Sequence, residues 1–350
     1  MQTDVPNSIS TAGNSLTSAA SNLSQDELKH NEELLEYFLA NYLYDTEEVA
    51  ERRKRIVARL TAMLKAWAVS MGTAKGIQEE LLVDGGGIQI QVFGSTRLEV
   101  QNYDTDMDLL VIAPYYITKS DFFTSFSDTL TTCPEVDNLL SIPEAYTPVL
   151  KFVIMGLSVD VIFTSLQIPK LNPTVDVLDL RCLKGLDEQS VRSLNGVRVA
   201  EWIYKLVPNM INYRTTLRAV KHWARQRGLY SNVLGFLGGV QFALLVAAVC
   251  QQFPHASPFT LLQKFFAMYA SWMWPCPVIL RRYEDLQFKD SDGNYFPVWN
   301  PVVNFKDSLH LMPIITPAYP AMNSAYNISQ PQFRCIHVSP FRSICSLFLF

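Results

Sequence analysis

A helical pattern of apolar and polar positions opens the ordered part of the chain. From Gln25 to about Trp67 apolar residues recur at helical spacing, and Ile56, Leu60 and Leu64 lie on a single stripe. Acidic residues come early in this stretch and basic residues follow them. The pattern predicts helices that pack one apolar face against a core.

A second pattern, of short alternating or apolar runs, begins after the three glycines at 85–87. Ile88, Ile90 and Val92 alternate with glutamines, which is typical of a half-buried strand. Further strands are expected over residues 107–113, 149–154 and 159–164, with a helix between residues 121 and 130. Because only residues 155–158 join the last two strands, we expect them to form a hairpin. These runs predict a mixed sheet with helices packed on it.

Strand patterns stop after about Val207, and helical patterns replace them. Helices are expected over residues 215–227, 237–252 and 259–270. Pro313, Pro317 and Pro320 would break any helix, so the segment around them should be extended. The predicted fold class is therefore an α/β domain followed by an all-α domain, with a cleft between them as the expected ligand site.

These changes of pattern divide the chain into four segments. Residues 1–24 are rich in Ser, Thr and Asn and are expected to form a disordered leader. Residues 25–207 should form the α/β domain with its N-terminal helices, and residues 208–330 the helical domain. Residues 331–350 form a tail with an apolar end that fits neither domain.

Composition excludes several classes of protein. The formal charge is −4, from 29 basic and 33 acidic residues, so any phosphate partner must be held by a local basic cluster rather than a general basic coat. The six cysteines form no Cys-x-x-Cys pair, which argues against a zinc site and a disulfide framework. The start lacks the order of a secretory signal, and no apolar run reaches the roughly 20 residues of a membrane span.

Two carboxylates stand at the start of a predicted strand. Asp106 and Asp108 are two residues apart, so on a strand they project from the same face. Hard oxygen ligands of this kind suit Mg²⁺, although an isolated Asp-x-Asp is more often a solvated acidic turn. Asp104 alternates onto the same face and leaves the choice of pair open.

A third carboxylate, Asp160, lies inside an apolar strand between Val159 and Val161. A lone Asp there is costly unless it is paired, hydrogen-bonded or bound to a metal. Gly94-Ser95 follows a strand and suits a phosphate group, although ordinary turns use the same residues. The combined set predicts nucleotidyl transfer, because three carboxylates can hold two cations during in-line attack on a phosphate.

Positive charge is expected on the helix over residues 215–227. Arg218, Lys221 and Arg225 share one face, which could hold a triphosphate or simply be solvated. After this helix, Tyr230 could stack on a base or ribose and Asn232 could bind a base edge. Ordinary capping contacts are the alternative for both.

Longer segments around these residues resemble the nuclear poly(A) polymerases of eukaryotes. The resemblance runs from about residue 32 to residue 329, in the family's order, through FGSTRLEV, DTDMDLLVIAP, EAYTPVLKF, LDEQSVRSLNGVRV, AVKHWARQRGLYSNVLGFLGGV and HLMPIITPAYPAMNS. It implies a polymerase-beta-like nucleotidyltransferase domain, a helical central domain and template-independent addition of AMP to RNA 3′ ends. Family members continue into an RNA-binding domain, and the tail from residue 331 is expected to replace it.

The resemblance also assigns roles to residues. Asp106, Asp108 and Asp160 would be the catalytic, metal-binding carboxylates, which makes Asp104 a bystander. The nucleotide or primer end would lie near Phe93, Gly94, Ser95, Tyr146, Lys151 and Asn195. The triphosphate and adenine would contact Lys221, Arg225, Tyr230, Asn232, Gly239 and Val240.

The implied cofactors are two Mg²⁺ or Mn²⁺ ions per site, with ATP as substrate. The implied partners are the 3′ end of pre-mRNA and cleavage and polyadenylation factors, met in the nucleus by a monomer with no membrane association. Two alternatives stay open. One is a related terminal nucleotidyltransferase that uses UTP or CTP; the other is a truncated, non-processive or decoy isoform that lacks a firm hold on RNA.

Overall fold

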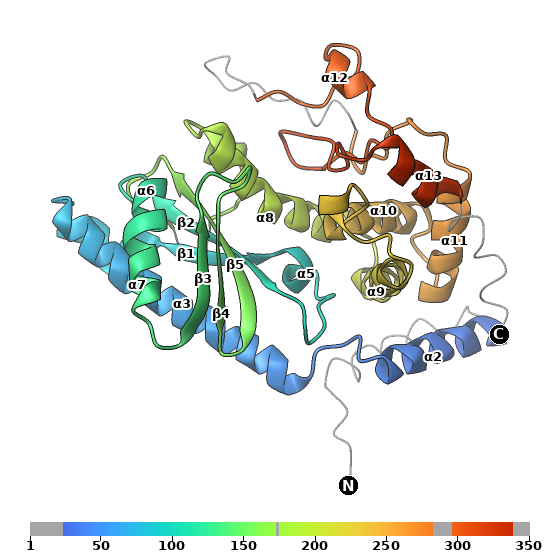
Figure 1. Ribbon diagram of the computed structural model, residues 1–350, viewed down its shortest axis with the longest axis horizontal. Coiled ribbons are helices and arrows are strands. Elements are labelled where there is room, and N and C mark those ends of the chain that lie inside the picture. The colour runs from blue at the N-terminus through green and yellow to red at the C-terminus, as the bar shows by residue number, and fades with distance from the viewer. Residues whose placement is uncertain (1–23, 173–174, 283–295, 339–350) are drawn as a thin grey trace, which may run out of the picture. The chain divides into compact units, whose positions relative to one another are not determined.

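A computed structural model describes residues 24–172, 175–282 and 296–338 (Figure 1). The chain divides into two units, one formed by Asp45–Glu201 and the other by the chain up to Tyr44 and from Trp202 onward. Most of the predicted leader and the tail beyond residue 338 lie outside the described residues.

The unit formed by Asp45–Glu201 is built on one five-stranded mixed sheet, as the strand patterns predicted. Its strand order is β1-β2-β5-β4-β3, in which β2 and β5 are parallel and the other neighbours are antiparallel. The strands are β1 (Gln89–Phe93), β2 (Met107–Pro114), β3 (Val136–Ile142), β4 (Val149–Ile154) and β5 (Leu157–Leu166). Strand β3, at the sheet edge, was not among the predicted strands.

The expected hairpin between the third and fourth predicted strands is confirmed. Ile154 of β4 pairs with Leu157 of β5, so Met155 and Gly156 alone form the turn. Both residues have positive φ, 51° and 75°, which matches the two-residue turns whose twist suits a hairpin. This turn determines every later pairing between the two strands.

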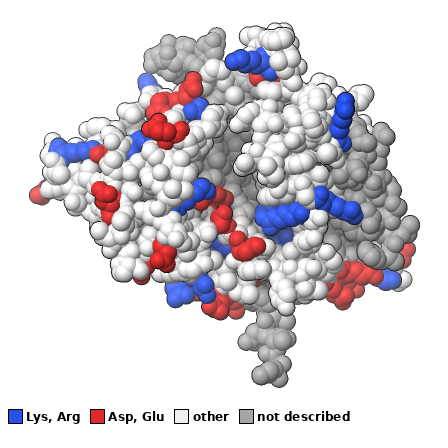
Figure 2. Space-filling view, viewed as in Figure 1, with Lys and Arg blue, Asp and Glu red and all other residues white. Residues whose placement is uncertain are grey.

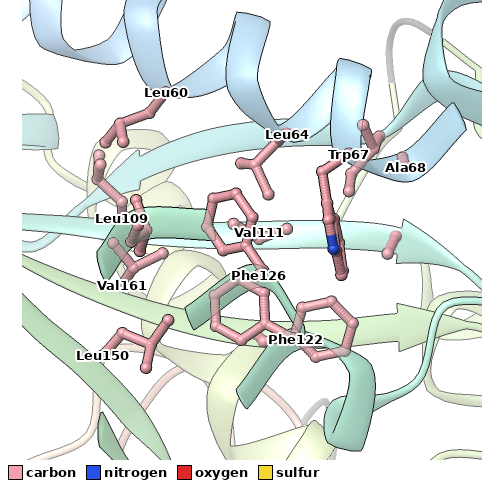
Figure 3. Packing of buried hydrophobic residues seen from close by; sticks show 14 of the residues in the cluster. Leu60, Leu64, Trp67, Ala68, Leu109, Val111, Phe122, Phe126, Leu150 and Val161 are labelled. Atoms are coloured by element: carbon pink, nitrogen blue, oxygen red, sulfur yellow. The ribbon is translucent and has the colours of Figure 1, made fainter. Parts of the chain in front are cut away.

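The apolar stripe of helix α3 (Glu47–Ala74) packs on this sheet. The helix begins at the N-cap Thr46, whose side chain accepts a hydrogen bond from the backbone N–H of Val49. Its residues Leu64 and Trp67 point toward Val111 of β2 and toward aromatic side chains of the segment after β2 (Figure 3). The core of this unit therefore lies between α3, one face of the sheet and the aromatic segment.

Shorter helical segments complete this unit. They are α4 (Glu79–Leu82), η2 (Val83–Gly87), α5 (Gly94–Arg97), α6 (Lys119–Asp121), the π-helical η3 (Phe122–Phe126), α7 (Ser127–Thr131) and η4 (Leu180–Leu183). Helix α8 (Glu188–Leu206) carries the chain from this unit into the next.

The second unit is helical, and the helices predicted after Val207 are confirmed there. Its helical segments are α2 (Gln25–Ala40), α9 (Met210–Gln226), η5 (Asn232–Leu234), α10 (Gly239–Gln252), α11 (Pro258–Ala270), α12 (Phe305–Ser308) and α13 (Gln330–Val338). The apolar α10 is buried, and the hydroxyls of Tyr213 and Tyr269 donate to carbonyls of its Ala243 and Leu245.

Helix α2 belongs to this second unit although it precedes the first unit in the chain. The Oδ1 atom of the buried Asn31 accepts a hydrogen bond from the backbone N–H of Phe259, at 3.0 Å. The Thr260 hydroxyl donates to Glu27 at 2.6 Å, and His30 stacks on the Phe259 ring. These contacts fasten α2 to the start of α11.

One face of the molecule carries charges of both signs. Figure 2 shows acidic and basic side chains interspersed over a face that is mostly uncharged. Across residues 24–172, 175–282 and 296–338, no helix combines the length and apolar character needed to cross a membrane.

Candidate active site

Four of the residues selected from the sequence form one row across the sheet. Phe93 of β1 is the register partner of Asp108 on β2, and Asp108 is the partner of Asp160 on β5. On the other side of β5, Asp160 is the partner of Lys151 on β4. Register partners on adjacent strands project from the same face, so the two carboxylates and the ammonium group lie beside one another.

Strand periodicity separates this row from the core. Met107, Leu109 and Val111 are fully buried members of the core under α3, and Asp108 alternates with them. Asp108 and Asp160 are both half-buried, on the face opposite that core. The apolar strands thus hold two carboxylates rigidly while leaving them partly accessible.

Gly94 lies directly against Asp108. A Cβ atom added at Gly94 would lie 2.2 Å from Oδ2 of Asp108, and Gly94 has a φ of +61°, which disfavours any other residue. Ser95 follows it in the single turn of α5, and the Ser95 carbonyl accepts a hydrogen bond from Val100 N at 2.9 Å. The glycine is therefore required both by its backbone conformation and by the space that the carboxylate occupies.

The Asp160 carboxylate forms an ion pair with the Lys151 ammonium group. The two side chains are 24% and 44% exposed. The sequence left open whether Asp160 was paired, hydrogen-bonded or metal-bound, and the structure shows a pair. Lys151 was already a candidate residue, but its contact with Asp160 was not predicted.

Asp106 and Asp104 both precede β2 and are exposed. Within the described residues, no group of three or more His, Cys, Asp or Glu side chains is arranged to hold a metal ion. The structure therefore brings Asp108 and Asp160 together and places Asp106 two residues before Asp108, without closing the three into one cluster. The three-carboxylate site remains a prediction.

The residues present nevertheless fit a hard divalent cation in chemistry and space. Asp108 and Asp160 offer carboxylate oxygens from adjacent strands, and Asp106 lies at the head of β2. Because Gly94 has no side chain, Oδ2 of Asp108 can lie where a Cβ atom would otherwise be.

Tyr146, before β4, has an exposed ring that stacks against the Arg192 guanidinium group. The guanidinium carbon of Arg192 lies 4.3 Å from the ring centroid, and Arg192 Nε donates to the Tyr146 carbonyl at 3.1 Å. Arg192, on α8, was not predicted; its location in the segment LDEQSVRSLNGVRV was the available signal. On the same helix, Asn195 accepts a hydrogen bond at 3.2 Å from the buried Arg198.

The other candidate residues lie in the helical unit. Lys221 is buried on α9, and the Arg218 guanidinium carbon lies 4.3 Å from the Tyr44 ring centroid. Burial raises the pKa of Tyr44, and the Arg218 charge opposes that shift. The predicted basic face thus contains one buried lysine and two arginines, each of which lies over a tyrosine ring.

Tyr230, Asn232 and the Gly238–Val240 turn lie close together. The Tyr230 ring stacks on Phe242 at 5.9 Å between centroids, and the Arg225 guanidinium carbon lies 4.9 Å from the Tyr230 ring. A Cβ at Gly239 would lie 2.9 Å from the Tyr230 hydroxyl oxygen, and Val240 is exposed. A guanidinium group, an aromatic ring and an exposed asparagine are therefore neighbours in this unit.

Family comparisons match both units. Residues 18–207 match the poly(A) polymerase nucleotidyltransferase domain, and residues 212–343 match the poly(A) polymerase central domain. The second match extends past residue 329, the predicted end of the resemblance.

Relatives extend well beyond the length of this chain. Nuclear poly(A) polymerase 2 of Arabidopsis thaliana is 43% identical over 309 residues, which are 88% of this chain and 38% of that protein. Nuclear poly(A) polymerase 4 of the same plant is 42% identical over 312 residues, covering 89% and 41%. The chain spans about two-fifths of the length of these curated relatives.

Solved structures support the fold. The Cid1 poly(U) polymerase with Mg 3′-dATP bound has a TM-score of 0.60 and 15% identity, covering 88% of this chain and 91% of its own. The complex of Cid1 with the UTP analog UMPNPP has a TM-score of 0.59, also at 15% identity, covering 89% and 92%. At this identity the likeness concerns the fold alone, and it confirms the predicted nucleotidyltransferase fold.

Proposed function

This chain belongs to the poly(A) polymerase family, and from this premise we propose that it adds AMP from ATP to RNA 3′ ends without a template. The observation that carries the proposal is the register of Asp108 with Asp160 on adjacent strands, with Gly94 against Asp108. Two half-buried carboxylates held side by side on a sheet serve no packing purpose, but they suit metal-assisted phosphoryl chemistry.

We assign the metal-binding role to Asp106, Asp108 and Asp160. When bound, divalent cations would stabilise the phosphate charge and favour deprotonation of the attacking hydroxyl. Magnesium and manganese both accept carboxylate oxygens, and we propose two ions of either metal per site.

Lys151 is proposed to orient the Asp160 carboxylate. Its ammonium group binds one carboxylate oxygen and thereby limits the rotation of the other. Because the pair is partly exposed, it also leaves Lys151 accessible to the phosphate of a nucleotide or to the primer end. Ser95 would contribute its hydroxyl to the triphosphate.

Binding of ATP is assigned to residues of the second half of α9 and of the segment from Tyr230 to the start of α10. Lys221 and Arg225 would hold phosphate oxygens, and Arg225 also keeps its guanidinium over the Tyr230 ring. Tyr230 would stack on the adenine or ribose, with Asn232, Gly239 and Val240 forming the rest of the pocket.

The RNA end is assigned to Tyr146, Phe93 and Asn195. One face of the exposed Tyr146 ring carries Arg192, which holds the ring in place for a base to stack on it. We propose the 3′ end of pre-mRNA as substrate, met in the nucleus by a monomer that acts with cleavage and polyadenylation factors.

The test is AMP incorporation onto an oligo(A) primer by the purified chain with Mg²⁺ or Mn²⁺. Asp108→Asn and Asp160→Asn should each lower the rate at least about a hundredfold, since even residues that support metal ligands cost 10- to 100-fold. Asp84→Asn is the matched control, because Asp84 pairs with Lys65 on the surface and is 63% exposed.

Competition among the four nucleoside triphosphates separates adenylation from the alternatives. Preferred incorporation of ATP supports the proposal, and preferred incorporation of UTP or CTP replaces it with a related terminal transferase. Tight ATP binding without primer extension or primer binding would identify a decoy isoform. Full activity of either carboxylate variant would remove the proposed site.

A further inference from the structure

A closed turn leads directly into Asp106. We call residues Gln101–Thr105 the approach loop. Within it the Thr105 backbone N–H donates to the Asn102 carbonyl at 3.1 Å, and the Asn102 N–H donates to the Thr105 hydroxyl oxygen at 3.0 Å. The Thr105 hydroxyl in turn donates to the Asn102 side-chain oxygen. Three hydrogen bonds therefore fix the turn immediately before the proposed metal-binding residue.

Arg53 of α3 is hydrogen-bonded to this turn. Its Nη2 atom donates to the Asn102 carbonyl and its Nε atom to Oδ2 of Asp45, each at 3.0 Å. The Arg53 side chain is only 4% exposed, and Arg53 shares the buried stripe of α3 with Ile56 and Leu60. Its guanidinium group thus connects the start of the helix to the carbonyl that closes the turn.

Packing alone does not explain an arginine at this position. Burying a guanidinium is costly unless it is well paired, and an apolar residue would continue the stripe. The pairing here is incomplete, because Arg53 Nη1 and Asp45 Oδ1 are buried without a hydrogen-bond partner among the residues described. We therefore expect Arg53 to have a role other than packing, which is to fix the position of the turn at Asn102.

The turn that Arg53 holds lies next to the proposed carboxylate site. The chain leaves the sheet at Gly94, which lies against Asp108, and it returns to the sheet through the approach loop and Asp106. Only Tyr103, Asp104 and Thr105 separate the carbonyl held by Arg53 from Asp106. Asp106 itself is exposed, and it lies between this turn and the buried Met107 at the start of β2, so the turn sets the backbone direction on one side of it.

We propose that Arg53 and Thr105 are positioning residues that set the direction of the Asp106 carboxylate for metal binding. The proposal rests on the function proposed above. Neither residue touches the reacting atoms in this assignment; both act through the turn at Asn102. Their loss should weaken metal binding more than it weakens the fold.

Three variants test this role. Thr105→Val keeps the shape of the side chain and removes the hydroxyl, Thr105→Ser keeps the hydroxyl, and Arg53→Lys keeps the charge but loses the planar fork. Arg59→Ala is the control, since Arg59 lies on the same helix in a surface pair with Glu135. Arg53→Lys could destabilise the fold, and Thr105→Val provides the independent measurement.

The first readout is Mn²⁺ binding to the nucleotide-free protein by electron paramagnetic resonance, which does not depend on activity. The second is the metal concentration for half-maximal AMP incorporation, compared with kcat at saturating metal. Thr105→Val and Arg53→Lys should each raise both metal constants about tenfold, the order expected when the turn loses one or two hydrogen bonds. For Thr105→Ser and Arg59→Ala, both metal constants should stay within about twofold of those of the native protein. The melting temperature of Thr105→Val should fall by only a few degrees.

Unchanged metal constants in both Thr105→Val and Arg53→Lys, with any change confined to the melting temperature, would overturn the proposal. Failure of the function looks different: the native chain would bind Mn²⁺ but incorporate no AMP. A double variant adds a further check. Two residues that act through one turn should be non-additive in their metal constants, and strict additivity would contradict the shared mechanism.

Discussion

Asp160 stands between Asp108 and Lys151, with a carboxylate partner on β2 and an ammonium partner on β4. Two neighbouring carboxylates repel each other, and an ammonium group beside one of them offsets part of that repulsion. The Lys151 ion pair therefore allows the two aspartates to remain side by side on the sheet. If the proposed site is correct, Lys151 should matter more for activity than for stability.

Lys151→Gln should separate these two contributions. Partly exposed ion pairs contribute about 0–1 kcal/mol to stability, so the free energy of unfolding should change little. AMP incorporation should fall about tenfold or more, because Asp160 loses the group that orients it. Chemical denaturation and primer extension on the same preparation check this, with Lys65→Gln, which breaks the surface pair with Asp84, as control. A large loss of stability with unchanged activity would reverse the assignment.

Gly94→Ala should abolish most activity. The added methyl group would lie 2.2 Å from Oδ2 of Asp108, so the carboxylate must move. Misplacement of a catalytic group by about 1 Å can cost on the order of a hundredfold in rate. We expect a loss of that size in kcat.

Gly76→Ala is the matched control for this experiment. Gly76 has a φ of +70°, close to that of Gly94, but a Cβ there meets nothing within 4 Å. Both variants carry the same cost of roughly 1–2 kcal/mol for a left-handed backbone. Only Gly94→Ala should lose activity; equal losses would show that backbone strain is responsible rather than the clash.

Much of the sheet could be predicted because its strands carry strong local patterns. Strand β3 could not, since Asp137, Asn138 and Ser141 interrupt its apolar positions and it lies at the edge, where little of it is buried. The pairing of Lys151 with Asp160 was within reach of the sequence. A hairpin closed by Met155 and Gly156 places these two residues opposite each other by counting alone.

Other contacts of the site depend on tertiary structure. Arg53 occupies a position in the apolar stripe of α3, and nothing local connects it to Asn102, which lies 49 residues later. The cation over Tyr146 comes from Arg192, 46 residues away in the chain. Such contacts join surfaces that only the folded sheet and helices bring together, so periodicity and spacing carry no information about them.

Tyr230 should determine nucleotide affinity through its ring. Stacking of a base on an aromatic side chain is worth about 1–3 kcal/mol, so Tyr230→Leu should raise the KM for ATP at least about fivefold. Tyr230→Phe keeps the ring that stacks on Phe242 and should stay near the native value. Steady-state kinetics with ATP and UTP check the prediction. A KM that changes equally in both variants would point to the hydroxyl instead.

His222 should make the helical unit less stable at mildly acidic pH. Burial, and secondly the charge of Arg225, lowers the pKa of His222 below its usual 6.5, and its Nε2 atom lies 3.1 Å from the Tyr37 hydroxyl. Since the unfolded chain takes up the proton more readily, this stability is complete above pH 6.5 and declines as the pH falls below it. His222→Gln should flatten the fall in urea midpoint between pH 7.5 and pH 5. Tyr37→Phe should lower the midpoint without flattening it, because the half-buried imidazole remains. An equally steep fall in His222→Gln would assign the acid sensitivity to other groups.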